Sequence, residues 1–260
     1  MNKSIGMERS GAVARITLDR ANVHNAFDDS MIAELTEALR AVESDRTVRA
    51  VVLTGEGSTF SAGADLNWMR RMADASEPEN RDDALRLAEL MRTLCFLGKP
   101  TIARINGSAY GGGVGLISCC DVAIGVDSAK FALSEVKLGL VPAVIAPYVR
   151  NAIGDRQARR YFVSGEVFDA AEAERIGLLH TRVPAAQLDE SVDRQLHWLS
   201  KGGPLAQHEA KRLASGLDRA EAERLDIANA SLIARLRVSD EGQEGLNAFL
   251  DKRPPRWVGA

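Results

Sequence analysis

The 260-residue sequence predicts an α/β fold that ends in a layer of helices. In the first half of the chain, short apolar or alternating segments are each followed by a turn and by a segment whose apolar residues have helical spacing. This alternation is typical of an α/β core. After about residue 185 the strand signals end, and three segments of helical periodicity follow, at 188–199, 203–216 and 220–236.

The core elements are expected in a fixed order along the chain. Residues 12–18 (AVARITL) alternate in the manner of a half-buried strand. Residues 28–45 predict a helix, because apolar residues recur there at helical spacing: Ile32, Leu35, Leu39 and Val42. A β-branched run at 48–55 predicts a buried strand. The cycle restarts at 57–65, which leads into a helical stretch over about 66–97, and again at 101–107, which leads into a glycine-rich segment.

The composition is that of an ordinary globular protein and argues against several kinds of partner. Hydrophobic residues make up 45% of the chain and charged residues 27%, and the net charge is −3. Because there is no run of Lys and Arg, we expect no nucleic-acid partner. No segment approaches the roughly 18 apolar residues of a membrane span, and none resembles a signal peptide. We therefore expect a cytoplasmic protein without a membrane partner.

Cysteine and histidine usage predicts neither a disulfide framework nor a metal site. The three cysteines are an odd number, and Cys119 and Cys120 are adjacent, which indicates a reducing compartment. We expect all three cysteines to be buried and to pack as small apolar residues. The four histidines are scattered without the spacing of metal ligands.

The segment AYGGGVGLISCCD, residues 109–121, holds four glycines within five positions at the start of an expected helix. It matches neither the dinucleotide-binding pattern nor the phosphate-binding loop. Glycines at a helix start serve close packing, or they let a ligand approach the free N–H donors at the positive end of the helix. The residues by themselves leave both interpretations open. For an anion site, Gly112 would supply one N–H, and FSAGAD (60–65) would supply a second.

Five segments, taken in order, resemble the enoyl-CoA hydratase/isomerase (crotonase) superfamily: FSAGADL, INGSAYGGGVGL, CCDVAI, FALSEVKLGLVP and RYFVSGEVFDAAEAERIGLL. The residues in these segments are most similar to those of bacterial methylglutaconyl-CoA and carboxygeranoyl-CoA hydratases. The resemblance implies a ClpP-like spiral of repeated ββα units in residues 1–185, which holds CoA and the active site. Residues 186–260 would then form a C-terminal helical region for oligomerisation and active-site closure. It also implies a homotrimer or hexamer, an acyl-CoA thioester substrate, and no cofactor besides the CoA of that substrate.

The resemblance also assigns roles to individual residues. The N–H groups of Ala64 and Gly112 would form an oxyanion hole around the thioester oxygen, and Glu135 would move protons. The family commonly has a second glutamate, and its position falls on Gly115, which has no side chain. A further set of residues is assigned to substrate binding: Asn25, Ala26, Ala62, Asp65, Leu66, Trp68 and Gly111.

Several of these residues have a structural alternative. Glu135 could form an ion pair with Lys137 or Arg104. Asp65 could cap the next helix, as Asp prefers to do. Asp121 fits a turn better than a catalytic role.

Three further groups are open between a role at the site and a plain structural one. Trp68, Met69 and Met72 have helical spacing and form either core or the wall of an acyl pocket. Arg70 or Arg71 could meet a carboxylate on the substrate, or both could lie on a solvated face. Lys252 or Arg253, in the basic C-terminal segment, could reach the phosphates of CoA.

Three functions remain open. The first is a hydratase that adds water across the α,β double bond of an enoyl-CoA. The second is a double-bond isomerase in which Glu135 acts alone, which the glycine at position 115 favours. The third is a CoA-binding oligomer without catalysis.

Overall fold

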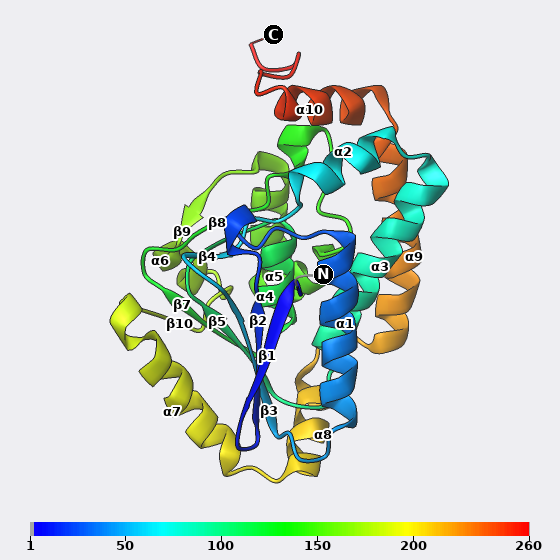
Figure 1. Ribbon diagram of the computed structural model, residues 1–260. Coiled ribbons are helices and arrows are strands. Elements are labelled where there is room, and N and C mark those ends of the chain that lie inside the picture. Colours follow the sequence, from blue (N-terminus) through cyan, green and yellow to red (C-terminus); the bar gives the residue numbers. More distant parts are fainter. Residues whose placement is uncertain (1–2, 260) are drawn as a thin grey trace.

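The computed structural model describes residues 3–259, and its strands form two sheets (Figure 1). The larger sheet has the order β1(Ile5–Ser10), β2(Val13–Leu18), β3(Ala50–Gly55), β5(Thr101–Ile105), β7(Val122–Val126) and β10(Thr181–Val183). The smaller sheet has the order β4(Thr59–Ser61), β6(Ser108–Tyr110), β8(Lys130–Ala132) and β9(Phe168–Asp169). All pairings are parallel except the antiparallel pairs β1–β2 and β8–β9.

Successive turns of the chain add one strand to each sheet before a helix follows. The strand pairs β3/β4, β5/β6 and β7/β8 repeat this step, and each is followed by at least one helix. Strand β3 is buried at every residue, because sheet or helix covers it on both faces. The predicted α/β fold of ββα units is therefore confirmed.

Ten α-helices surround the sheets within the described part of the chain. They are α1(Asp29–Ser44), α2(Leu66–Asp74), α3(Glu77–Cys95), α4(Gly112–Cys119), α5(Ala146–Ser164), α6(Ala170–Arg175), α7(Leu188–Ser200), α8(Pro204–Ala214), α9(Arg219–Arg237) and α10(Asp240–Leu250). On α1 the predicted apolar face is buried. Among these helices, none is long and apolar enough to cross a membrane.

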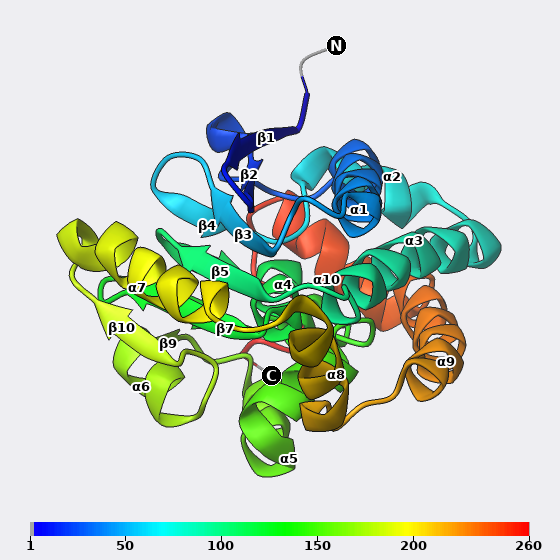
Figure 2. The same cartoon turned by 90° about the horizontal axis from the view of Figure 1, so that it is seen from below.

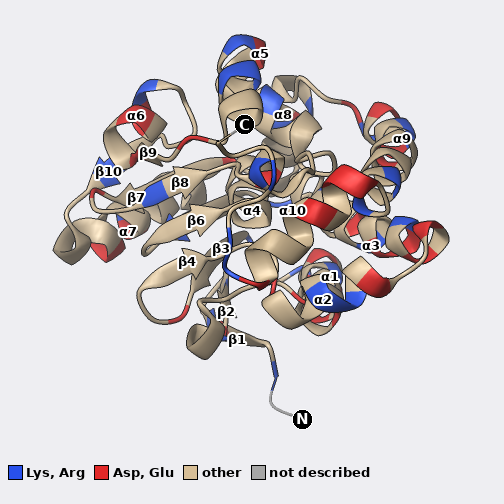
Figure 3. Cartoon of the chain, turned by 90° about the horizontal axis from the view of Figure 1, so that it is seen from above, with Lys and Arg blue, Asp and Glu red and all other residues tan. Residues whose placement is uncertain are grey.

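The helices after residue 186 pack on different parts of the core. Helix α9 lies along α3, and α10 contacts α2 and the turn after β8 (Figures 1 and 2). Helix α7 packs instead against β5 and β7 (Figure 2). In Figure 3, residues of both charge signs are mixed along α3 and α9, whereas α4 carries no charged residue. The C-terminal helices therefore reach the region where the expected site residues lie.

The structure corrects one prediction about the helices. The stretch over about 66–97 is two helices, because α2 ends at Asp74 and α3 begins at Glu77. Ser76 caps α3 in a reciprocal capping box with Glu79, and a proline lies in the first turn. These are strong signals for a helix start, so the chain begins a second helix here.

Candidate active site

A cavity of about 380 Å³ brings together the segments that carry the predicted site residues. Its wall combines the loop after β4, the start of α4, the turn after β8, and side chains of α2, α9 and α10. Ala64, Gly112 and Glu135, the three predicted catalytic residues, all line it. Residues that are far apart in the chain thus share one concave site.

The N–H groups of Ala64 and Gly112 are both unpaired donors. Phe27 bridges the loop on either side of Ala64, since its N–H donates to Gly63 O (2.6 Å) and its carbonyl accepts from Asp65 N–H (2.8 Å). Neither of these two hydrogen bonds uses the N–H of Ala64. Gly112 is the first residue of α4, where an N–H has no partner within the helix. Among residues 3–259, neither N–H donates a hydrogen bond.

The glycines at the start of α4 allow close approach on several sides. A Cβ on Gly112 would lie 2.9 Å from the Phe27 ring, and one on Gly113 would lie 2.9 Å from Ser61 Cβ. Gly111 has φ 48°, and a Cβ there would lie 3.0 Å from Glu135 Oε1. Both interpretations of the glycine cluster, close packing and an open helix end, therefore apply at this corner.

Glu135 carries a carboxylate oxygen that is buried and unpaired. It opens a short 3-10 turn, Glu135–Leu138, directly after β8. Although the residue as a whole is partly exposed, its Oε2 is buried without a hydrogen-bond partner among the described residues. Burial raises the pKa of Glu135 to about 7, because the charged form loses hydration. A carboxyl group with this pKa can both accept and release a proton near neutral pH.

Neither proposed ion-pair partner of Glu135 is available to it. Arg104 binds both carboxylate oxygens of Asp189, at 2.7 and 3.0 Å. Lys137 extends its aliphatic stem along Gly165 instead, since a Cβ on that glycine would meet it at 3.2 Å. The structural ion pair considered for Glu135 is therefore wrong.

The space beside Gly115 is filled by apolar side chains. A Cβ at this position would lie 2.4 Å from Ile145 Cγ2 and 3.2 Å from Met91 Cε. Among the described residues that line the cavity, Glu135 is the only carboxylate. The site therefore has one proton-carrying carboxyl group where two would be expected from the family pattern.

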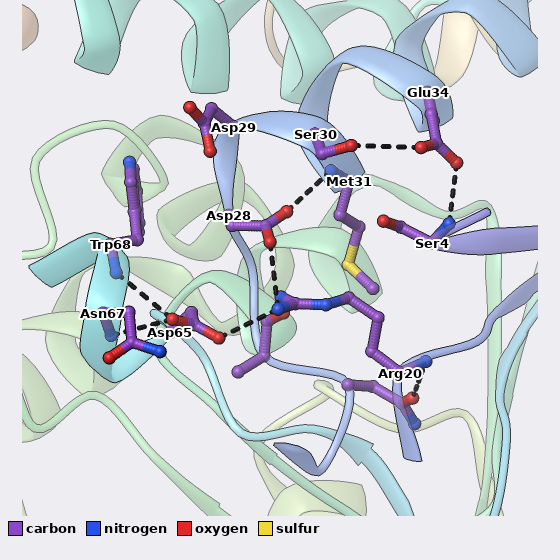
Figure 4. Close-up of polar contacts among 12 residues, drawn as sticks. Ser4, Arg20, Asp28, Asp29, Ser30, Met31, Glu34, Asp65, Asn67 and Trp68 are labelled. Atoms are coloured by element: carbon purple, nitrogen blue, oxygen red, sulfur yellow. Dashed lines mark hydrogen bonds and ion pairs between the residues drawn. The ribbon is translucent and has the colours of Figure 1, made fainter. Parts of the chain in front are cut away.

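Asp65 holds the loop in place rather than lining the cavity. Its Oδ1 caps α2 by accepting from the N–H groups of Asn67 (2.8 Å) and Trp68 (3.1 Å). Its Oδ2 accepts from Arg20 Nη2 at 3.0 Å, and the same nitrogen pairs with Asp28 at 2.9 Å (Figure 4). Arg20 thereby ties the caps of α1 and α2 together, so the capping alternative describes this residue.

The other predicted substrate-binding residues divide into two groups. Ala62, Gly111 and Trp68 line the cavity. Asn25, Ala26 and Leu66 do not. The side chain of buried Asn25 donates to the carbonyls of Glu56 (2.9 Å) and Thr59 (2.7 Å), which gives it a structural task, and Leu66 is 49% exposed.

The stripe on α2 lines the cavity, which was one of the two alternatives for it, whereas the neighbouring arginines do not. Trp68, Met69 and Met72 are all in the wall. Arg70 donates to Asn67 Oδ1 (2.9 Å) and Arg71 to Asp29 Oδ1 (2.8 Å), and neither reaches the cavity.

Sequence reasoning assigned the C-terminal region to active-site closure, but it did not identify the residues of α9 and α10 in the cavity wall. Ile233 and Arg237 of α9 and Leu246 and Phe249 of α10 complete the wall, and Arg253, one of the two residues considered for CoA phosphates, lines it as well. The helical spacing in this region could have identified a buried face, but not the site it faces. Asp121 lies elsewhere and pairs with Lys211 at 2.9 Å.

Comparison with known proteins places the chain in a family. The family described as "Enoyl-CoA hydratase/isomerase" matches residues 8–260. A putative enoyl-CoA hydratase of Thermus thermophilus is 33% identical over 249 residues, which cover 95% of this chain and 98% of that protein. The chain therefore belongs to the enoyl-CoA hydratase/isomerase family, the crotonase superfamily.

Solved structures show the same fold. A putative enoyl-CoA hydratase/isomerase (crotonase) of Legionella pneumophila is 45% identical, with a TM-score of 0.79 and coverage of 98% of this chain and 99% of that one. A putative enoyl-CoA hydratase of Mycobacterium avium paratuberculosis is 35% identical, with a TM-score of 0.89 and the same coverage of both chains.

Proposed function

We propose that the protein is an enoyl-CoA hydratase, which adds water across the α,β double bond of an acyl-CoA thioester. The observation that carries this proposal is the cavity itself, in which the unpaired, buried Oε2 of Glu135 shares a wall with the unpaired N–H groups of Ala64 and Gly112. The names of the relatives support the hydratase reaction.

The two N–H donors would act on the thioester oxygen. When a nucleophile adds to the β-carbon, electron density moves onto that oxygen, and donors fixed in advance stabilise the resulting enolate. Donors that are already oriented and free of other partners need no rearrangement at this step. Loss of one such donor typically reduces the rate by about 100- to 1,000-fold.

Glu135 would carry one proton of the added water from the water oxygen to the α-carbon. Its carboxylate takes a proton from the water as the oxygen bonds to the β-carbon, and the carboxylic acid then returns a proton to the α-carbon. The hydroxyl group and one hydrogen are thus added, and Glu135 ends in its initial state. A pKa of about 7 suits both half-steps.

A double-bond isomerase is the second candidate, and the apolar filling beside Gly115 favours it. In this reaction Glu135 removes a proton from the γ-carbon and returns one to the α-carbon, while the same two donors hold the dienolate. No water has to be held by a second carboxylate.

The proposal extends to the acyl group and the oligomeric state. A methylglutaconyl-type branched acyl group is the candidate suggested by the sequence motifs, and the reaction needs no cofactor beyond CoA. A homotrimer or hexamer is supported by α8, which has no buried residue in the single chain and exposes Leu205 and Leu213.

Reaction in water labelled with heavy oxygen tests the proposal. With an enoyl-CoA substrate, label in a β-hydroxyacyl product supports hydration, whereas a shifted double bond without label supports isomerisation. Glu135→Gln should reduce the rate of either reaction by about 100-fold or more and leave CoA binding intact. Unchanged turnover in this variant would contradict both reactions, and CoA binding without turnover in the wild type would indicate a non-catalytic binding protein.

A further inference from the structure

The wall of the active-site cavity contains a largely buried guanidinium group that the proposed chemistry does not use. Arg237 is the last residue of α9, it lines the cavity, and its side chain is 14% exposed. Burial lowers the pKa of Arg237, which reflects the cost of holding its charge there. A cation in such a position needs partners.

Three side chains fix the orientation of this guanidinium. Arg237 Nη1 donates to Asn80 Oδ1 at 3.1 Å and to Asp83 Oδ2 at 3.2 Å. The other oxygen of Asp83 accepts from Trp68 Nε1 at 3.0 Å, and the guanidinium lies 5.6 Å from the centre of the Trp68 ring. Asn80 and Asp83 are themselves buried, so the group is held rigidly.

Both hydrogen bonds that Arg237 donates use Nη1, which leaves the opposite edge of the guanidinium free. Among the described residues, Nε and Nη2 of Arg237 donate no hydrogen bond. Arg253, in the same wall, is different, because its Nη1 and Nη2 bind the two oxygens of Glu244 at 2.8 and 3.0 Å. The Nε–Nη2 edge of Arg237 has the fork geometry that binds both oxygens of a carboxylate.

Arg237 does not serve the proton carrier. Among the described residues, its ion pair is with Asp83, at 3.2 Å, and not with Glu135. The positive charge therefore belongs to another part of the cavity, where α2, α3 and α9 meet.

We propose that the free edge of Arg237 binds a carboxylate at the distal end of the acyl chain, so that the substrates are enoyl-CoA thioesters of dicarboxylic acids. This inference rests on the proposed function for the reaction at the thioester end. Asn80, Asp83 and Trp68 are positioning residues for Arg237. A desolvated, doubly hydrogen-bonded carboxylate contributes strongly to selectivity.

A matched pair of substrates tests the proposal: 2-hexenoyl-CoA and 2,3-dehydroadipyl-CoA, which have the same six-carbon chain and differ in the terminal methyl or carboxylate. We expect the wild type to show a kcat/KM about 10- to 100-fold higher for the carboxylated substrate, mainly through KM. A merely structural arginine would not produce this ratio. Equal kcat/KM values for the two substrates would overturn the proposal.

Variants assign the ratio to Arg237. Arg237→Met combined with Asp83→Asn, which avoids an unpaired buried aspartate, should bring the ratio close to one. Arg235→Met, an exposed position on the same helix, should leave it unchanged. Persistence of the ratio in the double variant would contradict the assignment.

Binding of unreactive analogues separates failure of this inference from failure of the proposed function. Adipoyl-CoA and hexanoyl-CoA lack the double bond, and their dissociation constants can be measured by calorimetry. If no enoyl-CoA is converted but adipoyl-CoA binds about tenfold or more tightly through Arg237, the carboxylate site stands and the reaction is wrong. If enoyl-CoA is hydrated and the two analogues bind equally, the reaction stands and the carboxylate site is wrong.

Discussion

Two carboxylates, Glu135 in the cavity wall and Asp83 behind it against Arg237 and Trp68, show how surroundings decide the role of a residue. Glu135 has a buried oxygen with no partner, and burial raises its pKa to about 7. Asp83 is only 3% exposed, and burial raises its pKa too, but Arg237 and Trp68 bind its two oxygens. A carboxylate with an oxygen free of partners can exchange a proton there, whereas one bound at both oxygens serves to hold its neighbours.

The largest difference is expected when each carboxylate is replaced by its amide. Glu135→Gln should reduce kcat by about 100- to 10,000-fold, the usual contribution of general acid–base catalysis, without loss of stability. Asp83→Asn should instead lower the free energy of unfolding by about 1–3 kcal/mol, because Arg237 loses a charged acceptor, and it should affect kcat far less. Steady-state kinetics and urea denaturation measure the two effects. A larger kcat loss in Asp83→Asn would reverse the assignment.

Removal of the cation tests whether Asp83 depends on its partner. Arg237→Met leaves a buried aspartate without its charged partner and should cost about 3–5 kcal/mol of unfolding free energy. Adding Asp83→Asn should recover most of this loss, because no unpaired charge remains. Denaturation of the two variants beside the wild type gives the values. Equal stability of the single and double variants would show that the pair is not desolvated.

The raised pKa of Glu135 should make the stability of the protein depend on pH. Because its pKa is raised to about 7 in the folded state, the folded protein binds more protons than the unfolded chain between about pH 4.5 and 7. Stability should therefore fall with rising pH across this window, by up to about 3 kcal/mol, and Glu135→Gln should remove that fall. Urea denaturation at pH 5 and pH 8 measures this fall in stability. The same pKa should make kcat/KM rise through about pH 7, because the carboxylate form accepts the proton. An identical pH dependence of stability in the variant would contradict a raised pKa.

The smallest effect concerns the space where a second carboxylate would stand. Gly115→Ala should destabilise the protein by about 1–3 kcal/mol, because the new Cβ overlaps Ile145 Cγ2. In an Ile145→Ala background the same change should cost less, since the clashing atom is gone. Thermal or urea denaturation of the four proteins gives the coupling. Additive effects would show that Ile145 does not occupy this space.

Much of the site was accessible to sequence reasoning because local signals carry it. The glycines at 111–113 and the FSAGAD loop each mark a strand-to-helix corner, and one residue of each corner, Gly112 and Ala64, lines the same cavity. Asp65 was assigned both a cap and a substrate role, and its hydrogen bonds are those of a cap. Arg70 and Arg71 were the candidates for a substrate carboxylate, but their positions on α2 direct them to Asn67 and Asp29.

By itself, the sequence determined the alternation of strands and helices, the bare start of α4 and the glutamate that follows β8, because these depend on residues within a few positions of one another. Only the tertiary structure decided that Oε2 of Glu135 is unpaired, that Ile145 and Met91 fill the space beside Gly115, and that Arg237 enters the cavity wall. The physical reason is that burial and pairing depend on atoms brought together from distant segments, such as α3 and α9, which no local pattern records.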